Sequence, residues 1–485
     1  MHGLTNPLTT WSDKRYVYAC ACDAKRARAV VATICAYLLV GAALTIPWTQ
    51  AAAHCTELRL ANGLRIIVKE DHRAPTVVQQ VWYRVGSMDE STGTTGVAHV
   101  LEHMMFKGTR AIASGELSRR VAEAGGRENA FTGTDYTVYF QQMHRDRLAL
   151  AMELEADRMA NLIVDKKEFS PEIKVVMEER RLRTDDRPRS LVFESLMAAA
   201  FTAHPYQWPV VGWMGDLENM TYQDAADWYR RWYAPNNAVV IIVGDVDAHE
   251  AFRLAERTYG RLQAKQLPSR KAVREPPQRG LRRVTVEAPA AQAYVMLGYK
   301  VPVLRQIERD WEPHALAVLT ALLGGTESAR LNQALVRERR IADQTAAAYK
   351  PMARGPGMLY VEGAVSQGSS AAELESAMRE QVERIAAEGP SEAELARAKT
   401  QLVAKRIYRE DSIYSQATEI GLLESAGLTW RDSERIIEGL RAVTAAQVRE
   451  VAGKYLTEDN LTVAVLAPQP MHARELRAAA PGLIH

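Results

Sequence analysis

Two stretches of the chain, residues 54–265 and 282–470, carry the same order of expected strands and helices. In each stretch a β-type run leads into an apolar helix and a Gly-Thr pair, at Gly108-Thr109 and again at Gly325-Thr326. A repeat of about 200 residues is the signature of a duplicated unit. The chain is 47% hydrophobic, which is enough to build a core in both copies. We therefore predict an α+β fold of two tandem homologous α/β-layer repeats, each an antiparallel sheet covered by helices.

Local patterns place the expected elements. Asn62-Gly63 between two β-type runs predicts a hairpin, and Ser114 before an amphipathic run predicts a capped helix. The expected strands are 76–85, 128–139 and 234–245 in the first copy, and 291–300 and 460–466 in the second. The expected helices are 96–107, 115–124, 145–163 and 169–183 in the first copy, and 312–323 in the second, followed by more helices. Residues 266–281 are polar and proline-rich, so they are expected to link the copies, and 471–485 form a tail.

Residues 1–53 have the pattern of a secretory signal peptide. A basic segment precedes an apolar run from about Val30 to Ile46, and the small residues 51–53 follow as a cleavage site. The run is somewhat shorter than the roughly 20 residues that a spanning helix needs. We expect an exported protein, periplasmic in a Gram-negative bacterium, and anchored in the membrane if the leader is not cleaved.

Charge and cysteine content limit the function classes further. The net charge is +2, but residues 1–53 alone hold five basic and two acidic residues, so the rest of the chain is nearly neutral. This balance argues against nucleic acid as a partner. Of the four cysteines only Cys55 lies outside the leader, so a cleaved chain has no internal disulfide and depends on its core.

Residues 96–109 contain the motif that carries chemistry. Thr94 or Thr95 is expected to cap this helix, and Gly108 to end it. His99 and His103 are one helical turn apart, so both imidazoles leave the same face. Neutral imidazoles at this spacing suit Zn²⁺, and the carboxylate of Glu102 beside them can take a proton from water. An amphipathic helix with two histidines on one face would give the same five residues, so a third ligand has to decide. In the second copy the matching positions are Leu316, Leu319 and Thr320, which offer no ligand set.

The stretch that decides is 171–180. Glu179 lies 76 residues after His103, and with the order His-x-x-Glu-His this spacing resembles the pitrilysin family of inverted-motif zinc peptidases. The resemblance implies that His99, His103 and Glu179 bind zinc and that Glu102 is the general base. Glu172, two turns before Glu179, then supports the site from behind the ligands.

The resemblance covers about residues 56–467 and extends beyond the ligands. Residues 125–139 look like the family's edge strand beside the zinc helix, and 204–206 and 233–237 look like its later markers. It implies a half-clamshell arrangement and substrate binding as an added strand along Asn129, Ala130, Phe131 and Thr132. The implied activity is zinc-dependent endopeptidase action on peptides or unfolded polypeptides.

One departure from the family pattern concerns the second copy. Many members carry an Arg and a Tyr seven residues apart that hold the substrate backbone and the oxyanion. Val336 and Asp343 occupy that register here, and neither can serve. The resemblance therefore implies a zinc-bearing subunit whose homologous partner carries the Arg/Tyr pair, or otherwise a homodimer. Two alternatives stay open, namely a non-catalytic structural or binding subunit and a different metal-dependent hydrolase.

Overall fold

The computed structural model describes residues 55–470, which belong to one compact unit. The expected signal peptide (1–53) and tail (471–485) lie outside the described residues. Within the described part, no helix is both long enough and apolar enough to span a membrane.

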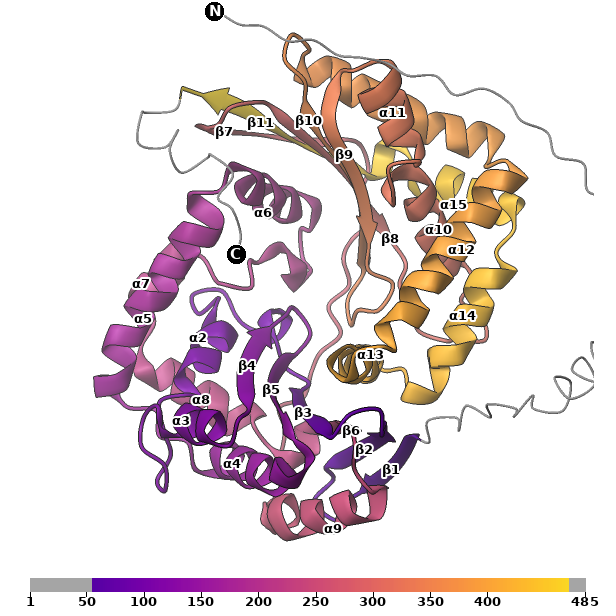
Figure 1. Cartoon of the computed structure of the whole chain (residues 1–485). Coiled ribbons are helices and arrows are strands. Elements are labelled where there is room, and N and C mark those ends of the chain that lie inside the picture. Colours follow the sequence, from indigo (N-terminus) through magenta and orange to yellow (C-terminus); the bar gives the residue numbers. More distant parts are fainter. Residues whose placement is uncertain (1–54, 471–485) are drawn as a thin grey trace, which may run out of the picture. The chain divides into compact units, whose positions relative to one another are not determined.

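A six-stranded sheet organises the first copy, in the order β1-β2-β6-β3-β5-β4 (Figure 1). Its strands are β1 (Cys55–Arg59), β2 (Arg65–Glu70), β3 (Thr76–Tyr83), β4 (Arg127–Thr132), β5 (Thr137–His144) and β6 (Ala238–Gly244). β1 and β2 form the predicted hairpin, and Gly63 in its turn has a φ of +86°. The β2–β6 pair is parallel and the other pairs are antiparallel.

The second sheet repeats this topology with five strands, in the order β7-β11-β8-β10-β9. Its strands are β7 (Arg282–Pro289), β8 (Tyr294–Val301), β9 (Ala342–Tyr349), β10 (Gly357–Val365) and β11 (Leu461–Gln469). β7 pairs with β11 in parallel, as β2 does with β6, and the other pairs are again antiparallel. The predicted fold class, two repeats of a helix-covered sheet, is confirmed.

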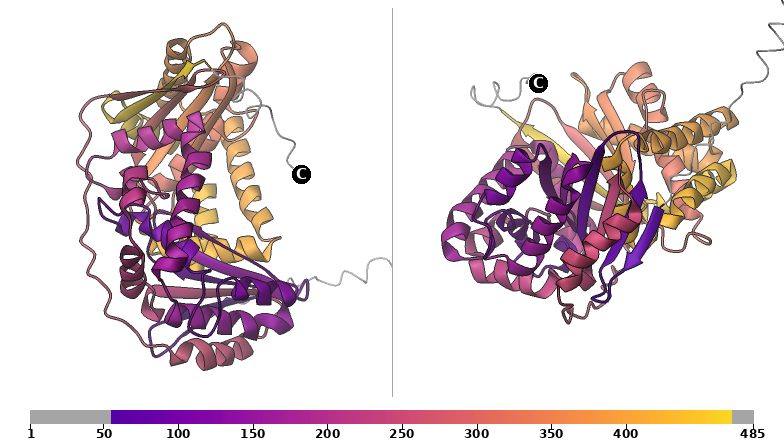
Figure 2. Two further views of the ribbon diagram at one scale, coloured as in Figure 1. Left: turned by 90° about the vertical axis from the view of Figure 1, so that its left-hand side faces the viewer. Right: turned by 60° about the horizontal axis from the view of Figure 1, so that its bottom comes forward.

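Helices cover both sheets (Figure 2). Those before the linker are α2 (Val97–Met104), α3 (Glu116–Glu123), α4 (Leu148–Asn161), α5 (Lys166–Arg180), α6 (Pro188–Ala200), α7 (Met214–Asn219), α8 (Tyr222–Trp232) and α9 (Ala248–Thr258). Those after it are α10 (Glu312–Gly324), α11 (Ala371–Glu388), α12 (Glu392–Arg409), α13 (Ile413–Ala426), α14 (Ser433–Ala442) and α15 (Ala445–Tyr455). Two π-helical segments, η3 (Arg181–Asp185) and η7 (Asn332–Glu338), and short 3₁₀ turns such as η1 (Ser87–Asp89) and η4 (Pro205–Gln207) complete the set.

Several strand predictions were incomplete or wrong. The single strand expected over 128–139 is two strands, because the N–H of Gly133 donates to the carbonyl of Tyr136 at 2.8 Å and closes a turn. β7, β9 and β10 were not predicted. β9 contains three consecutive alanines, which have low β-propensity, so pairing with β10 rather than local preference makes it a strand.

The two copies exchange one helix each (Figure 1). α6, from the first copy, packs on β7, β8 and β11 of the second sheet, and α13, from the second copy, packs on β3 and β6 of the first. Each sheet is therefore covered on both faces, and all seven residues of β6 are buried. The predicted copy boundaries remain predictions, but helices cross over between the copies.

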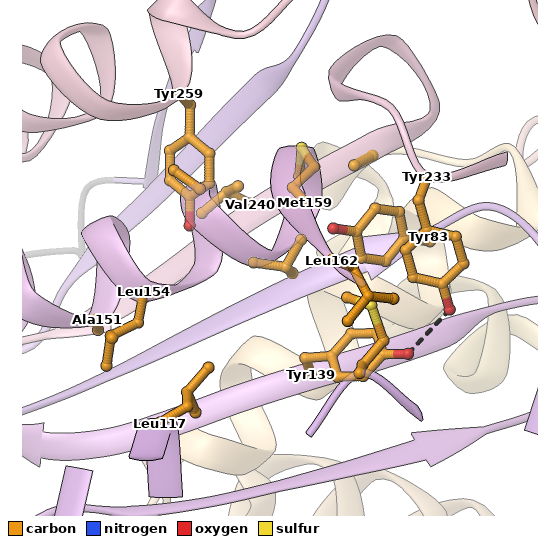
Figure 3. Packing of buried hydrophobic residues seen from close by; sticks show 14 of the residues in the cluster. Tyr83, Leu117, Tyr139, Ala151, Leu154, Met159, Leu162, Tyr233, Val240 and Tyr259 are labelled. Atoms are coloured by element: carbon orange, nitrogen blue, oxygen red, sulfur yellow. Dashed lines mark hydrogen bonds between the residues drawn. The ribbon is translucent and has the colours of Figure 1, made fainter. Parts of the chain in front are cut away.

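The main core of the first copy lies between its sheet and helices α2, α4, α5, α8 and α9. Figure 3 shows an aromatic group in this core, in which Tyr83 stacks on Tyr233 at 4.2 Å between ring centroids. The hydroxyls of Tyr139 and Tyr233 are 2.9 Å apart. The guanidinium of the fully buried Arg158 lies 4.4 Å from the centre of the Tyr139 ring. Tyr83, Tyr139 and Tyr233 belong to the same buried cluster as the apolar residues of α2.

Candidate metal centre

α2 holds both histidines, and its start differs from the prediction. Neither threonine caps it, since the hydroxyl of Thr94 donates to the carbonyl of Ser91 and that of Thr95 donates to Asp216. Instead, the carboxylate of Glu90 accepts hydrogen bonds from the backbone N–H groups of Gly96 (2.8 Å) and Ala98 (2.9 Å). Burial raises the pKa of Glu90 to about 8, although the hydrogen bonds from these two amides lower it. Glu90 thus satisfies the free amides that would otherwise be buried at the N-terminus of α2.

The chain just after α2 carries Lys107, which forms an ion pair with Glu172. The helix ends at Met104, so Lys107 lies beyond the last turn rather than in it. Gly108 has a φ of +105°, and a Cβ there would lie 2.8 Å from the carbonyl oxygen of Ile112. Gly108 thus has the predicted positive φ, but it stands four residues after Met104, so the helix ends before it.

His99, His103 and Glu179 converge from α2 and α5. The two imidazole rings lie 4.9 Å apart between centroids. The carboxylate of Glu179 lies 3.2 Å from Nε2 of His103 and 3.7 Å from Nε2 of His99. One donor atom from each of the three residues lies within 4.8 Å of the others. Two imidazole nitrogens and one carboxylate oxygen at this separation form a donor set that suits zinc.

Glu172 holds His103 from the side opposite to this donor set. Its carboxylate lies 2.8 Å from Nδ1 of His103 and 2.5 Å from Nζ of Lys107. Burial alone would raise the pKa of Glu172, but the hydrogen bonds from Lys107 and His103 lower it. With Nδ1 engaged by Glu172, His103 presents Nε2 to the donor set, which is how a carboxylate fixes the orientation of a ligand imidazole.

His99 is the more deeply placed imidazole. It is 7% exposed, and burial lowers its pKa to about 3. Its side chain is therefore neutral near pH 7, the form that binds metal.

Glu102 lies beside the donor set and contacts the edge strand. Its carboxylate accepts a hydrogen bond from the Thr132 hydroxyl at 2.5 Å. Burial raises the pKa of Glu102, although Thr132 lowers it. A carboxylate with a raised pKa is a stronger base than an exposed one, which suits proton transfer from water.

β4 has one free edge, because among the described strands it pairs only with β5. Of its four predicted substrate-binding residues, only Thr132 sends its side chain to Glu102. Phe131 packs edge-on against Trp82, in the cluster that α13 covers. Ala130 packs on the main core, and the Asn129 side chain accepts from the backbone N–H of Ala130 at 2.8 Å. Ala130 and Phe131 would therefore contact a peptide mainly through their backbone, while the side chain of Asn129 is exposed.

The side chains of Val336 and Asp343 make contacts within the second copy and do not supply the Arg/Tyr pair of the family pattern. Val336 lies in η7 and packs against the core of the second copy. Asp343, on β9, accepts a hydrogen bond from the Ser366 hydroxyl at 2.6 Å. Between them, Arg340 has a φ of +54° and is the sole non-glycine residue with positive φ among residues 55–470.

Two residues that contact the site or its helix, Glu90 and Arg183, were not predicted from the sequence. Glu90 lies seven residues before Val97, the first residue of α2, and reaches the helix through a loop, so no capping pattern marks it. Arg183, which forms an ion pair with Glu179, stands four residues after it, and this i, i+4 spacing could have suggested the pair.

Fold and site together define a two-repeat protein whose first repeat holds a candidate metal site with the inverted His-x-x-Glu-His motif. Residues 65–212 match the family described as Insulinase (Peptidase family M16), and residues 219–402 match the Peptidase M16 inactive domain. The chain belongs to the M16, or pitrilysin, family of metallopeptidases.

Two curated relatives illustrate the similarity. The zinc protease PqqE of Helicobacter pylori is 36% identical over 290 residues, which cover 59% of this chain and 64% of that protein. The uncharacterized zinc protease ML0855 of Mycobacterium leprae is 30% identical over 417 residues, covering 84% of this chain and 91% of that protein.

Solved structures share the fold. A protease from Helicobacter pylori superposes with a TM-score of 0.81 at 28% identity, covering 86% of this chain and all of that one. The periplasmic protease PqqL of Escherichia coli superposes with a TM-score of 0.73 at 18% identity, and this chain spans 49% of its length. The likeness to PqqL concerns the fold alone.

Proposed function

We propose that this protein is a zinc-dependent endopeptidase that acts on peptides or unfolded polypeptides, as the zinc-bearing subunit of a two-chain enzyme. The observation that carries the proposal is the convergence of His99, His103 and Glu179 within 4.8 Å, with Glu102 beside them. The relatives named zinc proteases support it.

His99, His103 and Glu179 would hold the zinc ion. When bound there, zinc supplies Lewis acidity, which lowers the pKa of water towards 7 and polarises a carbonyl group. Glu172 and Lys107 keep His103 in its ligating orientation.

Glu102 acts as the general base. Its carboxylate accepts a proton from the attacking water and then delivers that proton to the amine of the leaving peptide. The hydroxyl of Thr132 orients the carboxylate by donating to one of its oxygens, which leaves the other oxygen for water.

The free edge of β4 binds the substrate. An extended peptide that adds as a further strand gains main-chain hydrogen bonds with little demand on sequence. A folded substrate cannot present such a strand, so the proposal favours unfolded polypeptides. Export of the mature chain, suggested by residues 1–53, is part of the same proposal.

The test combines zinc analysis with peptide hydrolysis by the full chain together with its homologous partner. We expect one zinc per chain in the wild type and in Glu102→Gln, because the amide keeps the shape of the side chain. Turnover of Glu102→Gln should fall by about 10²–10⁴-fold, since the amide cannot accept the proton. Glu123→Gln, which changes an exposed glutamate paired with Arg119, is the matched control.

Each other outcome has a definite meaning. Near-normal hydrolysis by Glu102→Gln would exclude the role given to Glu102. A wild type that binds zinc and peptide without cleaving it would be a non-catalytic subunit. Cleavage of other bonds but not of peptide bonds would indicate a different metal-dependent hydrolase.

A further inference from the structure

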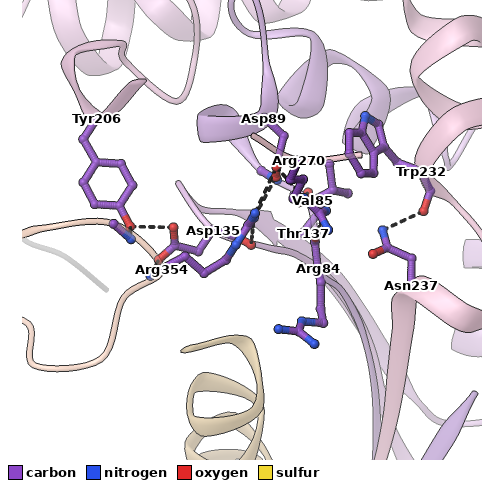
Figure 4. A network of polar contacts seen from close by, with 12 residues as sticks. Arg84, Val85, Asp89, Asp135, Thr137, Tyr206, Trp232, Asn237, Arg270 and Arg354 are labelled. Carbon is purple, nitrogen blue, oxygen red and sulfur yellow. Dashed lines mark hydrogen bonds and ion pairs between the residues drawn. The ribbon is translucent and has the colours of Figure 1, made fainter. Parts of the chain in front are cut away.

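The turn between β4 and β5 is held by Tyr206 of the first copy and by Arg354 of the second. Asp135 in this turn is 4% exposed. Its carboxylate accepts a hydrogen bond from the Tyr206 hydroxyl at 2.6 Å and another from the backbone N–H of Arg354 at 2.9 Å (Figure 4). The backbone carbonyl of Asp135 also accepts from the Arg354 guanidinium at 3.2 Å.

Arg354 lies in the loop between β9 and β10, and it anchors this loop a second time. Its guanidinium donates to both carboxylate oxygens of Asp89, at 2.7 and 3.0 Å. Arg270, in the linker between the copies, donates to the same carboxylate at 2.8 Å. The side chains of Asp89 and Arg354 are only 5% and 14% exposed. Burial strengthens this contact, because it excludes the water that weakens an exposed ion pair, and Arg270 adds a second cation to the same carboxylate.

The loop fits closely against the first copy. The backbone N–H of Gly355 donates to the Tyr206 hydroxyl at 2.7 Å, and this hydroxyl in turn donates to Asp135. A Cβ on Gly355 would lie 2.4 Å from a ring carbon of His204, so only glycine allows this approach. The tip of the β9–β10 loop is therefore fixed relative to the β4–β5 turn.

This connection bears on β4 itself. Thr132, the last residue of β4, directly precedes the turn and donates its hydroxyl to Glu102. Because β4 pairs with one strand only, its position depends on β5 and on the turn that joins the two. A strand held on one side is otherwise free to fray.

We propose that Arg354 is a positioning residue of the second copy, which holds the β4–β5 turn through Asp135 so that β4 presents its free edge to an extended peptide beside Glu102. This inference rests on the proposed function for its substrate. It gives the second copy, which contributes none of the candidate metal ligands, a part in peptide binding that acts through the β4–β5 turn.

The first test measures amide hydrogen exchange in the zinc-loaded full chain. In Arg354→Gln the amides of residues 127–136 should exchange about tenfold faster, the factor that matches the loss of one charge-assisted hydrogen bond. Tyr206→Phe removes only the hydroxyl and should show the same local change. Arg65→Gln is the matched control, because it breaks another ion pair between the copies, to Glu424, that does not touch β4. Exchange over 127–136 should be unchanged in this control.

The second test separates positioning from stability by steady-state kinetics with an unfolded fluorogenic peptide and the homologous partner. We expect KM to rise by about tenfold in Arg354→Gln, with a smaller fall in kcat, because strand binding is lost before chemistry. A purely structural role would lower kcat in proportion to the folded fraction and leave KM unchanged.

The outcomes separate the two proposals. Unchanged exchange over 127–136 in both Arg354→Gln and Tyr206→Phe, or an unchanged KM, would overturn the role of Arg354. If Arg354→Gln does not fold, Arg354→Lys replaces it, since a lysine keeps the charge but cannot bridge Asp89 and the carbonyl of Asp135 at once. A wild type without peptide hydrolysis would overturn the proposed function, and the exchange data would still decide whether Arg354 holds β4.

Discussion

Three glutamates on α5 lie close enough in sequence to compete for the role of third ligand, and their surroundings distinguish them. The carboxylate of Glu179 faces both imidazoles and is 16% exposed. Glu178 points to Arg181 and is 58% exposed, while Glu172 contacts His103 on its Nδ1 side. The family spacing selects Glu179 from these three, and Glu179 is the one whose carboxylate faces Nε2 of both histidines.

Neutralising each of the two adjacent glutamates should separate ligand from bystander. Loss of a residue that only supports a ligand typically lowers metal affinity by about 10–100-fold. Glu179→Gln removes a charged ligand itself, so zinc affinity should fall by more than that. Glu178→Gln should keep wild-type affinity, because its side chain faces solvent. Competition with a chromogenic chelator measures both affinities. Equal zinc binding by the two variants would contradict the assignment of Glu179.

The site residues that the sequence predicted are those whose positions follow from helical geometry. His99 and His103, one turn apart, and Glu172 and Glu179, two turns apart, share faces whatever the rest of the fold does. Glu90, Asp135 and Arg354 were not predicted, because loops and a second copy bring them to the site and no periodicity describes that path. The predictions that a threonine caps α2 and that Ser114 caps α3 were wrong. The N-cap residue of each helix is a glycine in the left-handed conformation, Gly96 and Gly115, which has no side chain to cap with.

At the scale of elements, the exchanged helix α13 closes the second face of the first sheet. Its residues Ala417 and Ile420 join Trp82 and Ile241 in one buried cluster. Gly421 faces the same way, and a Cβ there would lie 2.0 Å from a ring carbon of Trp82. The glycine therefore sets how closely α13 approaches the sheet.

Two glycines in helix interiors should respond in opposite ways to alanine. Gly421→Ala forces a methyl group into the Trp82 ring, so we expect a loss of about 1–3 kcal/mol in unfolding free energy. Gly453 lies on the exposed face of α15, where an added Cβ would have no neighbouring atom within 4 Å. Gly453→Ala should therefore raise the unfolding free energy by about 0.5–1 kcal/mol, because alanine has the higher helix propensity. Urea denaturation of each variant beside the wild type measures the change. A stabilising Gly421→Ala would show that α13 does not pack on β3 as described.

The elements that sequence patterns predicted well carry a strong local signal, namely a β-branched, buried run in β3 and β6 and an apolar helical pattern in α2. The β4–β5 hairpin was taken as one strand, because the β-branched and aromatic residues on both sides of Gly133 hide the turn. The exchange of α6 and α13 had no sequence signal at all. Each helix has an ordinary amphipathic or apolar pattern, and only the tertiary fold decides which sheet it covers.

At the scale of the whole molecule, the two copies are joined by more than their linker. α6, α13, the β9–β10 loop and the linker residue Arg270 all cross from one copy to the other or bridge them. A cut between residues 265 and 282 would expose the face of the first sheet that α13 covers. The duplication visible in the sequence thus describes the topology, while the packing of each sheet depends on a helix from the other copy.

The last prediction is that this chain alone is a poor peptidase and gains activity from a homologous partner with an Arg/Tyr pair. The reason lies in the second copy, where Val336 packs into the core and Asp343 is bonded to Ser366. Neither side chain can donate to an oxyanion, and loss of one such donor costs about 10²–10³-fold in turnover. The deficit should appear in turnover, with zinc content near one per chain.

Restoring the pair in the same chain, as Val336→Arg with Asp343→Tyr, should rescue little. Val336 is partly buried in η7, so an arginine there displaces core packing rather than reaching a substrate. The decisive measurement compares peptide hydrolysis by the chain alone, by the double variant, and by the chain mixed with its homologue. Full activity of the chain alone would mean that another residue holds the oxyanion. Activity that appears only on mixing would place the missing donors on the partner.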